Sequence, residues 1–253
     1  MDSQNILRIA VMAGEIMLSN GAETYRVEDT ITRIMRSHNC ENAEAFVIPT
    51  GIVAGLTNEN GTLSMVKRVK SRTYHLEKVT LVNELSRNIS AGNFYSLAEI
   101  EEKLKEIKET NPYPLMVRIF ASGFACFSFT YIFGGNLLDS AAAFIIGLAA
   151  YFIMDILRNV SGFLANIIGG AVIAFLALIL LNLGLGNALD KIIIGSIMIL
   201  VPGVAITNGV RDILAGDYLS GSSRIIDAIF VAVAIAAGVG GVLRIWLFIW
   251  GGF

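Results

Sequence analysis

The sequence predicts an α-helical integral membrane protein with about five transmembrane helices, preceded by a small α+β cytoplasmic domain of helices plus a β-hairpin. Of the 253 residues, 55% are hydrophobic and only 16% are charged, against about 25% charged in soluble proteins. The charge is also uneven: residues 1–111 hold 28 of the 40 charged side chains (19 Lys and Arg plus 21 Asp and Glu), and residues 112–253 hold the other 12. We therefore expect a cytoplasmic α+β domain over 1–111 and a transmembrane domain over 112–253.

The first part of the chain predicts two amphipathic helices. Residues 5–19 carry apolar side chains at helical spacing, and Asn20-Gly21 supplies a stop signal because glycine tolerates the left-handed conformation after a helix. A second apolar face predicts a helix over residues 23–37.

A β-hairpin and two more helices are expected next. Residues 45–56 are apolar and rich in branched side chains, residues 57–61 read Thr-Asn-Glu-Asn-Gly as a turn, and residues 62–69 alternate again. Helices are predicted over 74–91 and 96–109, the second opened by the capping box of Ser96 and Glu99. This domain is long enough for a core of its own.

Five stretches are long and apolar enough to cross a membrane, which takes about 20 residues. They are residues 118–138, 140–157, 163–183, 192–208 and 227–250. Since the second has a short uncharged centre, Asp139 and Asp155 must lie near the interfaces or face protein.

The basic residues predict the orientation. With the N-terminal domain in the cytoplasm, most arginines of the membrane part fall on the cytoplasmic side and Lys191 on the outer side, as the positive-inside rule prefers. This topology gives a multi-pass protein of the cytoplasmic (inner) membrane, with a cytoplasmic N-terminus and the C-terminus outside.

Residues 201–224, VPGVAITNGVRDILAGDYLSGSSR, form the most informative stretch. Pro202 removes a backbone donor and clashes with the preceding turn, so the span is expected to kink or unwind there and a helix to restart near Gly203. A broken membrane helix followed by charged residues is typical of a polar path through a transporter. The candidate substrate-binding or translocation residues are Pro202, Gly203, Thr207, Asn208, Arg211, Asp212, Asp217, Ser220 and Arg224.

Each side chain in this stretch has a chemical role to offer and a structural alternative. The restarting helix favours an anion at its N-terminus, and Arg211 can hold a carboxylate in bidentate fashion. Asp212 or Asp217 can bind an ammonium group or carry a proton. Alternatively, Arg211, Asp212, Asp217 and Arg224 form a salt-bridged cytoplasmic loop that clamps the fourth span to the fifth.

The residue types argue against several other functions. No basic face indicates a nucleic-acid partner, and the two cysteines and two histidines lack the spacing of a metal site. No phosphate-binding loop with a lysine is present, which argues against ATP hydrolysis. Thr24 and Thr50 have no base partner nearby in sequence, so no catalytic residue, metal or cofactor is expected.

Two stretches together resemble the threonine/serine exporter family, in particular its N-terminal half. In residues 13–34, Asn20, Gly21, Ala22, Thr24, Arg26, Val27 and Glu28 match the family pattern. In the second stretch the matching residues are Pro202, Gly203, Asn208, Arg211, Asp212, Gly216, Asp217, Ser220, Gly221 and Arg224. Pro49, Thr50 and Gly51 also look like the family's, and Glu15 and Glu23 complete the candidate set of the cytoplasmic motif.

The resemblance implies an inner-membrane exporter with a cytoplasmic N-terminal domain. Full-length members continue into a second membrane part, whereas in shorter members that part is a separate small integral membrane protein. The chain is similar to the larger subunit of that two-component form, with a small membrane partner, membrane lipid and a hetero- or homo-oligomeric assembly as expected partners.

We expect export of threonine- or serine-type amino acids driven by the proton gradient, for which aspartates are natural carriers: all six acidic residues after residue 111 are aspartates. Some split-system relatives are linked to succinate, so a dicarboxylate exporter subunit is the first alternative. A membrane-anchored hydrolase or sensor and a scaffold subunit that supports a transporting partner are the others.

Overall fold

The computed structural model describes residues 3–40, 42–59, 61–70, 73–92 and 95–251. They form two compact units, each described by itself: residues 1–112 with 203–226, and residues 113–202 with 227–253. Residues 203–226 were predicted to belong to the transmembrane domain, but they cluster with the N-terminal residues.

The N-terminal unit begins with the two predicted helices, α1 (Ser3–Ser19) and α2 (Thr24–Ser37). Their expected apolar faces are buried, with Ile6 and Ile9 on α1 and Val27 and Ile31 on α2 among the core residues. Asn20 ends α1 by donating from Nδ2 to the Ile16 carbonyl over 2.7 Å.

Three antiparallel strands replace the predicted hairpin. They are β1 (Asn42–Ile48), β2 (Gly51–Asn58) and β3 (Gly61–Arg68), in that order in the sheet. The apolar run 45–56 is divided because Pro49 and Thr50 make a turn that places Ile48 opposite Gly51. The second turn joins β2 to β3 where the sequence predicted one; its Asn60 lies outside the described residues.

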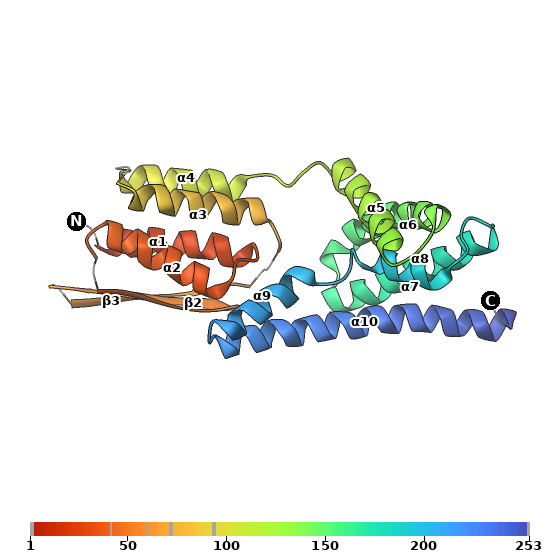
Figure 1. The fold of residues 1–253 in the computed structure, drawn as a ribbon. Helices are drawn as coiled ribbons and strands as arrows, with labels where there is room; N and C mark the ends of the chain where they lie inside the picture. Colours follow the sequence, from red (N-terminus) through yellow and green to blue (C-terminus); the bar gives the residue numbers. More distant parts are fainter. Residues whose placement is uncertain (1–2, 41, 60, 71–72, 93–94, 252–253) are drawn as a thin grey trace. The chain divides into compact units, whose positions relative to one another are not determined.

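Helices α3 (Leu76–Ser90) and α4 (Leu97–Glu109) complete three layers, in which α1 and α2 lie between them and the sheet (Figure 1). The capping box is confirmed: Ser96 Oγ accepts from the Glu99 backbone N–H, and the Glu99 carboxylate accepts from that of Ser96. The unit also contains α9 (Gly203–Leu214) and the first turns of α10 (Tyr218–Trp250).

The second unit is all-helical. It consists of α5 (Leu115–Ile132), α6 (Leu137–Ile156) with the 3₁₀ turn η1 (Leu157–Asn159), α7 (Gly162–Asn182), α8 (Leu189–Ile197) and the rest of α10. Four helices are long and apolar enough to span a membrane: Leu115–Ile132, Leu137–Asn159, Gly162–Asn182 and Tyr218–Trp250. They correspond to the first, second, third and fifth predicted spans.

The predicted number of five spans is not confirmed, because residues 192–208, the fourth predicted span, do not form one continuous helix. Helix α8 ends at Ile197, a turn and bend follow, and α9 starts at Gly203. The break falls where Pro202 cannot donate a backbone hydrogen bond, as predicted. The stretch therefore consists of two short helices that belong to different units.

Both aspartates at the ends of the second span have partners. Asp139 is buried at the start of α6, where Oδ2 accepts from the Asn136 N–H and Oδ1 from those of Asn187 and Ala188. Asp155 lies 3.6 Å from Arg118. Each faces protein, as expected for charge at the ends of an apolar helix.

Candidate functional site

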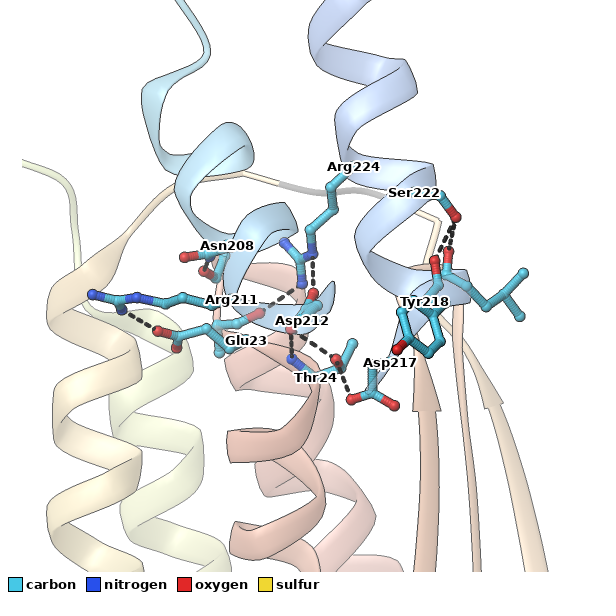
Figure 2. Close-up of polar contacts among 12 residues, drawn as sticks. Glu23, Thr24, Asn208, Arg211, Asp212, Asp217, Tyr218, Ser222 and Arg224 are labelled. Atoms are coloured by element: carbon cyan, nitrogen blue, oxygen red, sulfur yellow. Dashed lines mark hydrogen bonds and ion pairs between the residues drawn. The ribbon is translucent and has the colours of Figure 1, made fainter. Parts of the chain in front are cut away.

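The two motifs singled out in the sequence meet in the N-terminal unit. In the turn after α1 and the first turn of α2, Gly21, Glu23 and Thr24 bond to residues of α9, and the Ala22 carbonyl accepts from Arg224 of α10. Figure 2 shows the side chains of Glu23 and Thr24 beside α9. Residues almost two hundred positions apart thus form one polar cluster.

Asn208 connects α9 to the turn after α1. It is buried, and its Nδ2 donates to the Gly21 carbonyl over 2.8 Å. Gly21 has a φ of +92°, and a Cβ there would lie 2.6 Å from Cδ1 of Tyr74. Glycine is required at this turn for both reasons.

Asp212 is the most buried charged residue of the cluster, with 0% of its surface exposed. Its Oδ1 accepts from the backbone N–H of Thr24 over 3.3 Å and lies 3.0 Å from Thr24 Oγ1. Asp217 Oδ2 lies 3.3 Å from the same hydroxyl. Thr24, at the first turn of α2, therefore sits between two carboxylates (Figure 2).

Arg224 supplies the buried positive charge. Its Nε is 3.0 Å from Asp212 Oδ2, and its Nη2 donates to the Ala22 carbonyl over 2.8 Å. The Nε and Oδ2 atoms are close but are not aligned for a hydrogen bond, and neither has another hydrogen-bond partner. The pair is thus an electrostatic contact between buried groups. The hydrogen bonds of Arg224 and Asp212 are made instead with the Ala22 carbonyl and with Thr24.

The pKa of Asp212 is raised above its ordinary value chiefly because burial disfavours the carboxylate. The Arg224 charge and the hydrogen bonds from Thr24 oppose that rise, and the charge of Asp217 adds to it. Burial likewise raises the pKa of Glu28, against the hydrogen bond that its Oε1 accepts from the Val47 N–H over 2.8 Å.

A cavity of about 530 Å³ lies beside this cluster. Its lining includes Glu23, Arg26, Thr207, Asn208 and Arg211 from the two motifs. Glu23 is buried and binds two guanidinium groups: Oε1 is 2.6 Å from Arg211 Nη1 and Oε2 is 3.2 Å from Arg26 Nε. One carboxylate between two partly exposed arginines leaves a net positive charge and free donor capacity at the cavity wall.

Helix α3 supplies lining residues that sequence reasoning did not select. Leu76, Val79 and Thr80 contribute apolar surface and one hydroxyl. Nothing in their local pattern distinguishes them from ordinary helix residues, so only the packing of α3 against α2 could reveal them. Ala22, whose carbonyl binds Arg224, was recognised only as part of the family pattern.

Other predicted residues lie apart from the cavity lining. Glu15 is 3.1 Å from Lys67 on β3. Asn20 ends α1, Pro49 and Thr50 form the β1–β2 turn, and Gly51 begins β2. The Thr50 carbonyl accepts from the Val69 N–H. Ser220 is buried near the start of α10, and Pro202 precedes the cavity-lining Gly203.

Close helix crossing explains a glycine of the second motif. A Cβ on Gly221 of α10 would lie 2.4 Å from Cγ1 of Ile213 and 2.6 Å from the Gly209 carbonyl oxygen. The crossing of α9 and α10 therefore needs a residue without a side chain there. The close crossing of α9 and α10 keeps Asp212 on α9 next to Arg224 on α10.

Among the described residues, no group of three or more His, Cys, Asp or Glu side chains could hold a metal ion. A second concavity, of about 640 Å³, lies over β1 and β2 and contains none of the motif residues. The charged groups in the cavity lining are the carboxylate of Glu23 and the guanidinium groups of Arg26 and Arg211.

Comparison with known proteins places this cluster in a transport family. Residues 8–246 match the model of a family described as "putative threonine/serine exporter". A "probable succinate transporter subunit YjjP" of Klebsiella aerogenes is 22% identical over 97% of this chain and 95% of its own length. Its counterpart in Escherichia coli K12 is 22% identical over 95% of this chain and 94% of its own.

A longer relative carries the family's other substrate name. A "probable threonine/serine exporter" of Mycobacterium tuberculosis is 23% identical over 94% of this chain but only 45% of its own length. No solved structure matches the chain significantly. With both motifs and nearly the whole chain inside the family model, this chain belongs to the family of threonine/serine exporters.

Proposed function

We propose that the chain is one subunit of a secondary exporter that moves small carboxylate-bearing metabolites out across the cytoplasmic membrane. The observation that carries the proposal is the cavity of about 530 Å³, where Arg26 and Arg211 share the single carboxylate of Glu23. A substrate carboxylate can bind the unused N–H groups of either arginine in bidentate fashion. Family membership favours transport over catalysis.

The first turn of α9 supports the same role. Gly203 and Val204 line the cavity at the start of this helix. The leading N–H groups of a helix lack intrahelical partners and carry partial positive charge, so they add to the attraction for an anion. The break at Pro202 thus gives the cavity a helix N-terminus.

Two substrate classes fit a carboxylate-binding cavity. A threonine- or serine-type amino acid would place its ammonium group near Glu23, and the family description and the Mycobacterium tuberculosis relative favour this class. A dicarboxylate would use both arginines, which the excess positive charge and the names of the two full-length relatives favour. Proton-driven export is our proposal for either.

We also propose that a second membrane subunit completes the transporter. Relatives of this chain's length are named as subunits, whereas the Mycobacterium tuberculosis relative is about twice as long. We place the N-terminal unit in the cytoplasm, with the cavity receiving substrate from that side.

Efflux from cells preloaded with a threonine dipeptide or with succinate tests the proposal. Arg211→Ala is expected to abolish export of the true substrate, and Arg211→Lys to retain part of it, while both remain in the membrane. Arg158→Ala removes an exposed arginine that is not among the cavity-lining residues and serves as the matched control. Equal efflux in wild type and Arg211→Ala would contradict the site assignment.

A further inference from the structure

The hydroxyl of Thr24 lies within hydrogen-bonding distance of two carboxylates. Oγ1 is 3.0 Å from Asp212 Oδ1 and 3.3 Å from Asp217 Oδ2. A hydroxyl has a single proton to donate. That proton can bond fully to only one of the two carboxylates, so a proton on the other carboxyl group, donated to Oγ1, would complete a second full hydrogen bond.

The local charges favour such a proton. Asp212, Asp217 and Glu28 gather around the start of α2, since the charges of Asp217 and Asp212 both act on Glu28. The basic group facing them is Arg224, which lies against Asp212. Nearby Arg26 and Arg211 are both paired with Glu23. Several acids facing one buried cation bind a proton more readily than isolated acids do.

Burial further favours a bound proton at Asp212. The side chain is fully buried, and its raised pKa has that burial as its main cause. Its Oδ2 and the Arg224 Nε lie 3.0 Å apart without hydrogen-bond alignment. The ion pair therefore stabilises the ionised carboxylate less than a well-formed bidentate pair does.

We propose that Asp217, Thr24 and Asp212 form a proton-binding relay. Asp217 is partly exposed and receives the proton from water, whereas Asp212 is buried against Arg224. In the transfer, the Asp217 carboxyl gives its proton to Thr24 Oγ1 while the hydroxyl proton of Thr24 passes to Asp212 Oδ1. One O–H bond breaks and one forms at each step, and the threonine ends as it began.

Proton arrival at Asp212 changes the contact between α9 and the first turns of α10. A neutral Asp212 no longer balances the buried charge of Arg224, which retains its bond to the Ala22 carbonyl. A buried cation without a counter-charge is strongly unfavourable. Protonation thus loosens this contact, and its use in export rests on the proposed function, whereas proton binding does not.

Infrared difference spectroscopy on the purified full-length chain measures the bound proton directly. We expect wild type to show the carbonyl stretch of a protonated carboxylic acid that is missing from both Asp212→Asn and Asp217→Asn. Thr24→Val is expected to move the pH of half-protonation upward by about one unit, because the lost hydrogen bond stabilises an ionised carboxylate.

Thr30→Val is the matched control. Thr30 is also fully buried on α2, and its Oγ1 has no hydrogen-bond partner. This variant should leave the signal and its midpoint unchanged. Identical carboxylic acid signals in wild type and in Asp217→Asn would overturn the relay. Because Asp217 is partly exposed, this substitution does not disturb the buried core.

The pH profile of export separates the relay from the proposed function. With functional wild-type export, Thr24→Val should shift the midpoint of the profile, and Thr24→Ser should restore it. An unshifted profile beside normal wild-type efflux contradicts the relay alone. Absent wild-type efflux of any carboxylate, with the infrared signal present, contradicts the exporter proposal and leaves the relay standing.

Discussion

The side-chain amide of Asn208 donates to the backbone carbonyl of Gly21 over 2.8 Å, joining residues 187 positions apart. Because the amide is buried, this bond fixes α9 against the turn that starts α2. Asn208→Ala should therefore lower the free energy of unfolding by about 1–3 kcal/mol, since it leaves a buried carbonyl unpaired. Thermal unfolding of the full chain in detergent measures this, with Asn166→Ala as the control because the half-buried Asn166 donates to the Gly162 carbonyl of its own helix. Equal losses in both variants would contradict a linking role.

Gly21→Ala should destabilise the chain for two separable reasons. Its φ of +92° costs any other residue about 1–2 kcal/mol, and the new Cβ would meet Tyr74 at 2.6 Å. Gly92→Ala isolates the first term, because Gly92 has a φ of +90° and nothing within 4 Å of its ideal Cβ. We expect Gly21→Ala to lower the unfolding temperature further than Gly92→Ala does. Equal decreases in unfolding temperature would mean that the Tyr74 side chain can move away from the new Cβ without destabilising the chain.

The Asp212–Arg224 pair should show strong coupling in a double-mutant cycle. Either Asp212→Asn or Arg224→Met alone leaves a buried charge or polar group uncompensated and is expected to cost about 3–5 kcal/mol. The double variant should cost less than the sum of the two. Denaturant unfolding of the four proteins measures the coupling. The exposed pair Asp190–Lys191 is the reference and should couple by about 0–1 kcal/mol.

Glu28→Gln should remove part of the pH dependence of stability. Burial raises the pKa of Glu28 above 4.5, so the folded state holds the proton more tightly than the unfolded state. Stability from this group is then greatest at acid pH and falls as pH rises through 4.5 to the folded-state pKa. The variant keeps an oxygen for the Val47 N–H, and should be flatter over this window and at least as stable at neutral pH.

Glu101→Gln provides a control of opposite sign. Hydrogen bonds from Arg8, and then from Lys105, lower the pKa of Glu101 to about 2. Its stabilisation is present above about 4.5 and is lost as pH falls toward 2. Glu28→Gln should therefore change the pH dependence of stability above pH 4.5, and Glu101→Gln should change it below pH 4.5. If both variants changed stability in the same pH range, the environments assigned to the two glutamates would be wrong.

Some glycines of the helical unit are required for close contact between helices, and others are not. A Cβ on Gly238 would lie 2.1 Å from the Ile167 carbonyl oxygen, whereas Gly240 has nothing within 4 Å. Gly238→Ala is expected to separate α10 from α7 and to lower the folded yield and unfolding temperature strongly. Gly240→Ala should be neutral or slightly stabilising, because alanine favours the helix. A severe effect of Gly240→Ala would contradict this difference between the two glycines.

Local patterns account for much of this fold. Apolar spacing predicted the buried faces of α1 and α2 because a helix brings every third or fourth side chain to one side. The capping box at Ser96 and the helix start at Gly203 depend on groups within three or four residues, and both are confirmed. The β1–β2 turn was missed because Pro49 and Thr50 interrupt a run whose apolar character continues on both sides.

By itself, the sequence determined the apolar helices, the break at Pro202 and the two polar motifs, because hydrophobicity and the missing proline donor act within one turn or one span. Only the tertiary structure decided that α9 clusters with residues 1–112 and that Thr24 lies between Asp212 and Asp217. Hydrogen bonds and buried charges act over a few ångströms in space. Their partners are therefore set by which helices the folded core brings together.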